Sequence, residues 1–166
     1  MSIIDSLLGN KTKQVKVHAG EIFGLWQHLV QRYDIRELTD IFQNFANDID
    51  FKVLLTAGMN VIDKEIAILE NQMDSFGIPL PPRPPKSINT KTNTEILRDE
   101  LMFRVIYMGM QNFVAQQVQT TMQMQNKTLT EIFQRASKDE LEFVQKLGSY
   151  GKLKGWLFIP PEYKTN

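Results

Sequence analysis

A run of prolines near the middle of the chain limits the folds that this sequence can adopt. Residues 77–86 read Gly-Ile-Pro-Leu-Pro-Pro-Arg-Pro-Pro-Lys, with five prolines in seven positions. Proline has no backbone N–H and its ring clashes with the preceding helical turn, so neither a helix nor a central strand continues through this segment. The run therefore divides the chain into two parts of similar length, each long enough for a pair of helices.

Apolar residues recur at the three- and four-residue spacing of a buried helix face on both sides of the prolines. Two such segments precede them, at residues 19–46 and 51–76, and each is long enough for a helix of roughly 40 Å. Between these segments, residues 47–50 (Asn-Asp-Ile-Asp) break the pattern and supply side chains that cap helices. So short a break predicts an antiparallel pair of helices.

Two further helices are predicted after the prolines. The third helix follows a capping-box sequence at residues 92–95 and runs to about Gln125. The fourth follows Asn126, and glycines are expected to end it: Gly148, Gly151 and Gly155. The four segments together predict a single all-α domain over residues 1–166, folded as an antiparallel four-helix bundle.

The remaining segments are interpreted as additions to this bundle. Residues 1–18 form an N-terminal extension whose apolar cluster at residues 3–8 predicts a short helix. Residues 77–93 form a proline-rich linker that crosses from the second helix to the third, and its Pro-x-x-Pro spacings also suit docking into an aromatic groove. Residues 151–166 form an apolar and aromatic C-terminal tail that we expect to pack against the bundle.

Composition narrows the classes of function. Lys plus Arg and Asp plus Glu both total 19, so no bulk positive charge favours nucleic acid as a partner. Cysteine is absent, which excludes disulfides and thiolate chemistry and suits a cytoplasmic location. No apolar run approaches the roughly 18 residues of a membrane span, and the N-terminus lacks the charge order of a secretory signal.

Histidine is too scarce for the dinuclear metal site that four-helix bundles often carry. That site takes a Glu-x-x-His pair from each of two helices. The chain has two histidines, His18 and His28, and neither lies three residues after a glutamate. Serine-hydrolase and phosphate-loop motifs are also absent. The sequence therefore favours a protein that is not an enzyme.

A reduced metal site is a narrower alternative. Some polar residues fall in line with the predicted core faces, where an unpaired carboxylate is costly: Glu21, His28, Glu65 and Asp99. One hypothesis is a mononuclear or degenerate site for iron, manganese or zinc built from these four. The other is that each residue pairs with a nearby Lys or Arg, caps a neighbouring group or lies at the edge of its helix face. Because the sequence contains no recognised cofactor-binding motif, no cofactor is predicted.

The third helix is unusual in its polar face. Residues 111–126 carry no charge and are rich in Gln, Thr and Met, and methionine suits adaptable contact surfaces. We therefore expect a homodimer that forms through this helix or through the N-terminal helix, with contacts to other proteins as a further option.

Several short motifs, taken in their order, resemble an uncharacterised ferritin-like family of spore-forming Firmicutes that is similar to spore-coat-F-like proteins. They are Glu21-x-x-x-Leu25-Trp26, Ile78-Pro79-Leu80-Pro81-Pro82, Asp99-Glu100-Leu101, Gly155-Trp156-Leu157 and Pro160-Pro161. The resemblance spans residues 19–163 and implies a ferritin-like bundle with no established activity. It also implies polar sites inside the bundle at Glu21, Glu65 and Asp99, although relatives carry histidine where this chain has Glu65.

The resemblance implies a function as well as a fold. Many relatives contain two bundles in tandem, so a single bundle such as this one favours a dimer. The expected function is a non-enzymatic structural or protein-interaction role, cytoplasmic or spore-associated. The alternative is a metal-binding or oxidative protein that uses the reduced carboxylate and histidine site.

Overall fold

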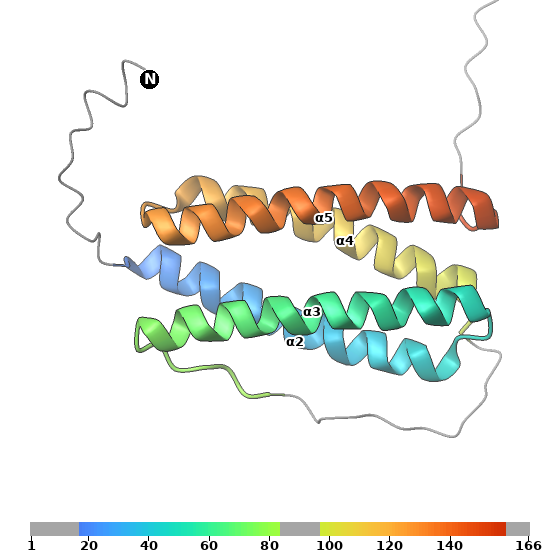
Figure 1. The fold of residues 1–166 in the computed structure, drawn as a ribbon, viewed down its shortest axis with the longest axis horizontal. Coiled ribbons are helices and arrows are strands. Elements are labelled where there is room, and N and C mark those ends of the chain that lie inside the picture. The colour runs from blue at the N-terminus through green and yellow to red at the C-terminus, as the bar shows by residue number, and fades with distance from the viewer. Residues whose placement is uncertain (1–16, 84–96, 159–166) are drawn as a thin grey trace, which may run out of the picture.

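The computed structural model describes residues 17–83 and 97–158, and this part of the chain is all-α. It consists of four long helices: α2 (Ala19–Phe45), α3 (Ile49–Ser75), α4 (Asp99–Gln123) and α5 (Lys127–Lys154) (Figure 1). The predicted N-terminal helix, the capping box at residues 92–95 and the end of the C-terminal tail lie outside the described residues. None of the described helices is both long and apolar enough to cross a membrane.

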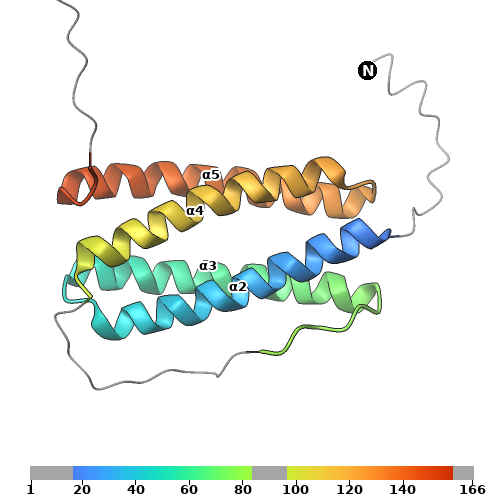
Figure 2. The same ribbon diagram turned by 180° about the vertical axis from the view of Figure 1, so that it is seen from behind.

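The helices form two antiparallel hairpins. In the first, α2 packs along α3, and in the second, α4 packs along α5; the hairpins meet mainly through α2 and α4, which run side by side (Figure 2). Helix α4 begins beside the start of α3. The end of α3, at Gly77, and the start of α4 therefore lie at opposite ends of the bundle (Figure 1). The linker thus joins two hairpins, as its prolines predict.

The two hairpins use the same end structures at a constant offset of 78 positions. Asp48 caps α3 by accepting from the Phe51 N–H, and Asn126 caps α5 by accepting from the Leu129 N–H. The second helix of each hairpin is followed by a glycine with positive φ, Gly77 at 65° and Gly155 at 70°. Such a left-handed residue is the usual way to satisfy the last carbonyls of a helix. The offset reveals an internal structural repeat.

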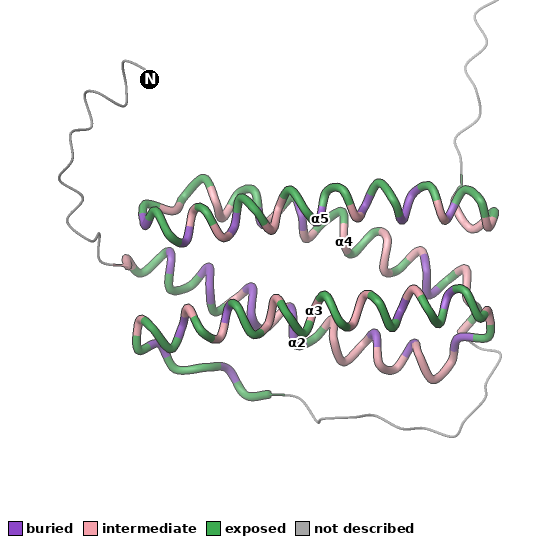
Figure 3. The backbone as a smooth tube through the Cα atoms, viewed as in Figure 1, coloured by how far each residue is buried: buried purple, intermediate pink, exposed green. Residues whose placement is uncertain are grey.

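The core is divided into two apolar clusters, and Figure 3 shows buried residues recurring along each helix. The first contains Leu25, Leu29, Tyr33, Leu69, Met73, Ile78, Leu129 and Phe133. The second contains Phe42, Ala46, Phe51, Leu55, Met102, Phe103 and Leu147. Because one cavity borders each cluster and both cavities are lined by Arg32 and Glu65, these charged residues lie between the two clusters.

Three details of the helices differ from the prediction. Leu97 and Arg98 are not helical, so α4 begins at Asp99, later than the capping box implies, and Arg98 caps it without a side-chain hydrogen bond. Trp26, which falls in the apolar spacing of residues 19–46, is 40% exposed and does not belong to the core. The third difference concerns the glycines of α5.

Helix α5 continues through Gly148 and Gly151, and only Gly155 ends it. Both inner glycines serve close packing instead of termination. A Cβ atom at Gly151 would lie 2.4 Å from Cε1 of Phe103, and one at Gly148 would lie 3.1 Å from the Tyr107 hydroxyl. Beyond the helix, Trp156 and Leu157 pack against the second cluster, while Phe158 is 85% exposed.

We expect Gly151→Ala to destabilise the protein by about 1–3 kcal/mol, because the added methyl group overlaps a buried aromatic ring. Chemical denaturation measures the free energy of unfolding. Gly109→Ala is the matched control: nothing lies within 4 Å of a Cβ there, so alanine should stabilise α4 by about 0.5–1 kcal/mol. Equal effects of the two substitutions would contradict the close-packing role.

Candidate functional site

Glu21 caps the turn between α4 and α5. Its Oε1 accepts hydrogen bonds from the backbone N–H groups of Gln125 and Asn126, both at 2.6 Å, and its Oε2 accepts from His18 N at 3.0 Å. The residue is 1% exposed. Burial raises the pKa of the Glu21 carboxyl, but the three backbone donors together hold it below its ordinary value. Glu21 is therefore a structural anion.

Asp99 performs the equivalent task at the other end of the bundle, 78 positions further along. Its carboxylate accepts from Asn47 N at 3.0 Å and from Asp48 N at 2.7 Å, in the turn between α2 and α3. Each hairpin thus contributes the carboxylate that closes the turn of the other. Glu21 and Asp99 lie at opposite ends of the molecule, so they do not form one site.

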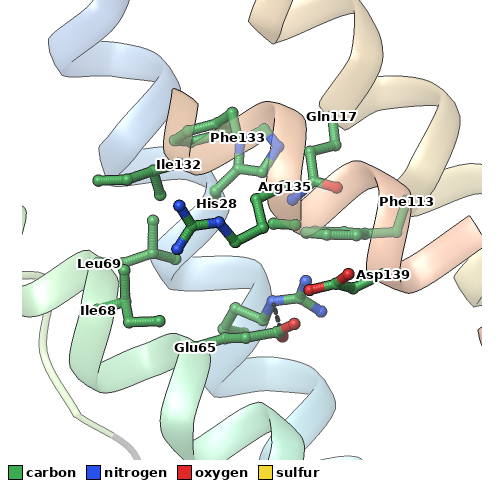
Figure 4. Close-up of a pocket in the computed structure, with 12 residues that line it drawn as sticks. His28, Glu65, Ile68, Leu69, Phe113, Gln117, Ile132, Phe133, Arg135 and Asp139 are labelled. Atoms are coloured by element: carbon green, nitrogen blue, oxygen red, sulfur yellow. Dashed lines mark ion pairs between the residues drawn. The ribbon is translucent and has the colours of Figure 1, made fainter. Parts of the chain in front are cut away.

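Glu65 belongs to a buried ion cluster in the middle of the bundle. Arg32 on α2 is 3% exposed, and its Nε lies 2.9 Å from Oε2 of Glu65 on α3. The Arg32 Nη2 contacts Oε1 of Glu140, which is 4% exposed on α5. Its guanidinium also lies 4.0 Å from the centre of the Phe113 ring on α4. One cation therefore joins all four helices. Figure 4 shows the ion pair of Glu65 as a dashed line.

Burial is the largest influence on the pKa values of Glu65 and Arg32. It raises the pKa of the Glu65 carboxyl, and nearby Asp139 raises it further, while Arg32 opposes both effects. Burial also lowers the pKa of Arg32, and Glu65 opposes this. The buried Glu140 and the partly buried Glu65 share one buried guanidinium, so removal of the cation would leave their charges without this partner.

His28 lies beside the ion cluster in a neutral state. It is 1% exposed, and its ring contacts Phe113 and Phe133 edge-on at centroid distances of 5.3 and 4.9 Å. Its Nδ1 lies 2.9 Å from the carbonyl oxygen of Gly24, so Nδ1 carries the proton. Burial lowers the pKa of His28 to about 4, and Arg32 acts in the same direction.

His28 should make the protein sensitive to acid. A pKa that folding lowers from 6.5 to about 4 gives stability that is complete above pH 6.5 and is lost as the pH falls through 4. The loss is on the order of 3 kcal/mol. The contribution of Glu65 to stability changes with pH in the opposite sense, because folding raises the pKa of its carboxyl.

The difference between the wild type and His28→Phe, measured by urea denaturation at each pH between 7 and 4, isolates the histidine. We expect the stability of the wild type relative to this variant to fall over that range. His18→Asn is the control, because asparagine also caps helices and His18 is partly exposed at the start of α2. A constant difference would contradict the buried neutral state of His28.

The four sequence candidates therefore have separate places. Glu21 and Asp99 cap turns and Glu65 pairs with Arg32, which is the alternative predicted above to a shared metal site. Within residues 17–83 and 97–158, no three His, Cys, Asp or Glu side chains are grouped so that they could hold a metal ion. Of the four, His28 and Glu65 line the same cavity, from different sides (Figure 4).

Arg32 and Glu140 were missed as members of this site. Their positions carry a signal nonetheless, because each falls in the core spacing of its helix. Arg32 follows Leu29 by three residues, and Glu140 precedes Val144 by four. A charged residue on each of two core faces predicts a buried pair, but the sequence does not show which faces meet.

Comparisons with known proteins support an uncharacterised family. A family model described as "Protein of unknown function (DUF3231)" matches residues 5–166. None of the curated proteins matches the chain. A crystal structure of a "putative spore coat protein" from Bacillus halodurans C-125 is similar, with a TM-score of 0.86 and 24% identity over 93% of this chain and 100% of that chain.

At that identity, the likeness to the Bacillus halodurans protein shows a shared fold. Two parts of the resemblance seen in the sequence are confirmed: membership of an uncharacterised family and structural likeness to a putative spore coat protein. Because the family model spans nearly all residues, the chain belongs to the DUF3231 family of proteins of unknown function.

Proposed function

We propose that this protein is a non-enzymatic structural bundle that assembles with a second copy of itself through α4. The buried charged groups support a structural role, since Glu21 and Asp99 close turns and Glu65 and Glu140 neutralise Arg32. One long connection between the second and third helices is also a feature of ferritin-like bundles, so we assign the bundle to that class.

The observation that carries the proposal is an uncharged strip along the exposed side of α4. Its members alternate at four- and three-residue steps over three heptads, and all are exposed: Leu101, Val105, Met108, Asn112, Ala115, Gln119 and Met122. This is the spacing by which one helix packs against another.

A second copy is the partner that fits this strip best. The strip has no charge that would need an opposite charge on a different protein, and the chain as a whole has a formal net charge of zero. Two α4 helices related by a two-fold axis would present the same surface to each other. Assembly of identical bundles also suits a spore-associated layer, which is the setting that the name of the Bacillus halodurans protein suggests.

Light scattering of the purified chain tests this proposal. We expect a dimer that the double substitution Met108→Glu and Met122→Glu converts to a monomer, because it places four charges in a desolvated two-fold contact. Val53→Glu is the matched control: Val53 is 65% exposed on α3 and is not part of the strip. A monomeric wild type at high concentration, or dissociation by Val53→Glu alone, would refute assembly through α4.

A further inference from the structure

A groove runs between α3 and α5, which lie on the same face of the bundle (Figure 1). Extensive backbone contacts join α2 to α3, α4 to α5 and, to a lesser degree, α2 to α4, but they do not join α3 to α5. Two cavities, of about 280 and 390 Å³, occupy consecutive stretches of these two helices, and their walls share Arg32, Glu65 and Asp139. The two hairpins are therefore closed on the side of α2 and α4 and open on the side of α3 and α5.

The walls of this groove have the spacing of a surface that binds a helix. On α3, the lining residues follow one another at alternating four- and three-residue steps: Leu54, Gly58, Val61, Glu65 and Ile68. The lining residues of α5 show the same steps from Ile132 to Lys146. These are the steps at which one helix meets another. Val61 and Ile68 are nevertheless 50% and 47% exposed, so the apolar edge of the groove lacks a cover among the described residues.

The N-terminal residues have the pattern that such a groove accepts. Their apolar side chains share one side of a helical projection: Ile3, Ile4, Leu7 and Leu8. Ser2, Asp5 and Ser6 fall on the opposite side. The other stretches outside the described residues fit less well. Residues 84–96 have only two large apolar residues, eight positions apart, and residues 159–166 contain two prolines, which interrupt a helix.

The chain enters the described structure beside this groove. Val17 packs against the first apolar cluster, and Leu69 and Phe133 of that cluster also line the smaller cavity. In Figures 1 and 2, the start of α2 lies beside the end of α3 and the start of α5. His28, on the cavity wall, is roughly 14 Å along α2 from Ala19. Residues 9–16 can span up to about 26 Å, which is enough to bring residues 3–8 to the smaller cavity.

We propose that residues 3–8 dock into the groove between α3 and α5 of the same chain, with their apolar side over the smaller cavity. Docking covers Ile68 and removes apolar surface from water on both partners. The short connection to α2 favours the chain's own groove over that of another molecule, because it holds the segment at a high effective concentration. The groove lies on α3 and α5, so docking leaves the strip on α4 free for assembly (Figure 2).

A single introduced thiol tests this docking, because the chain has no cysteine of its own. Ala136→Cys places the thiol on the wall of the smaller cavity, at a partly exposed position, and its rate of alkylation by N-ethylmaleimide is measured in the full chain. Addition of Ile4→Asp and Leu7→Asp should raise this rate at least about ten-fold, because two aliphatic side chains no longer stabilise the docked state. Both positions precede the four described helices, so folding of the bundle is not at risk.

Two controls make the result specific. Ser2→Asp with Ser6→Asp adds the same charge to the polar side of the segment and should leave the rate at Ala136→Cys unchanged. Ser149→Cys, exposed on α5 and outside both cavities, should react at one rate with either pair of substitutions. An unchanged rate at Ala136→Cys with Ile4→Asp and Leu7→Asp, or an equal increase with the serine substitutions, would contradict docking. Protection that disappears on dilution would place the segment in the groove of a second copy and would equally overturn the proposal.

Discussion

Arg32→Met should lower the free energy of unfolding by about 3–5 kcal/mol, because it leaves the buried Glu140 and the partly buried Glu65 without their cation. Methionine keeps the length and much of the volume of the arginine stem, so the effect is not a simple cavity. Urea denaturation at pH 7 measures it. Arg36→Met is the matched control one turn further along α2: its ion pairs with Asp40 and Asp63 are partly exposed, and its loss should cost at most about 1 kcal/mol.

The pH dependence of the stability of Arg32→Met should show whether unpaired carboxylates cause its destabilisation. Without Arg32, burial and Asp139 both raise the pKa of Glu65, and nothing on the described residues opposes them. A raised carboxyl pKa gives stability that is present at low pH and is lost as the pH rises through it. The deficit of Arg32→Met relative to the wild type should therefore be larger at pH 7 than at pH 5.

Replacement of the whole charged cluster provides the decisive comparison. The triple variant Arg32→Met, Glu65→Leu and Glu140→Leu should recover most of the stability that Arg32→Met loses, to within about 1 kcal/mol of the wild type, because no buried charge remains unpaired. If the triple variant is as unstable as Arg32→Met alone, the cost comes from lost packing against Phe113 and not from unpaired carboxylates.

Glu21→Ala should be about as damaging, at about 3–5 kcal/mol, because it deprives three backbone N–H groups of their acceptor. Two of these groups form the turn that joins α4 to α5, and Asn126 there is 6% exposed. Chemical denaturation gives the total effect. Amide hydrogen exchange should locate the destabilised part of the protein: the backbone amides of Gln125 and Asn126 should exchange faster than in the wild type.

The equivalent substitution in the other hairpin is the control for Glu21→Ala. Asp99→Ala removes the same kind of acceptor from Asn47 and Asp48, but these groups are closer to solvent and water can replace it. We expect a cost of about 1 kcal/mol, typical of a helix cap. If both substitutions cost the same, burial is not what makes Glu21 important.

Local sequence patterns were sufficient for most of the secondary structure. Helical spacing of apolar residues and the capping residues Asp48 and Asn126 predicted four helices and both hairpin turns. The glycines were harder to interpret, since Gly151 and Gly155 are both glycines near the end of the predicted helix and the sequence alone does not distinguish them. One permits close contact with Phe103 and the other adopts positive φ, and only the three-dimensional neighbours distinguish them.

The carboxylates of the candidate site were predictable as members, whereas Arg32, Glu140 and the grouping of the residues were not. Glu21, Glu65 and Asp99 were identified because a carboxylate on an apolar face must have a partner. Their partners come from other helices: Glu21 meets Gln125 across 104 positions, and Glu65 meets Arg32 between α3 and α2. Long-range pairing depends on the rotation and crossing of each helix, which one sequence does not specify.

The sequence by itself determined that the chain forms two helical hairpins, because proline excludes a helix from residues 77–86 and the apolar spacing on each side requires a second helix to cover it. The tertiary structure decided what the buried polar residues do. The packing of the two hairpins against each other sets Arg32 between two carboxylates, directs Glu21 to a distant turn and places His28 and Gln117 on the lining of a cavity. Periodicity fixes which side of a helix is buried, whereas packing alone fixes which atoms that side meets.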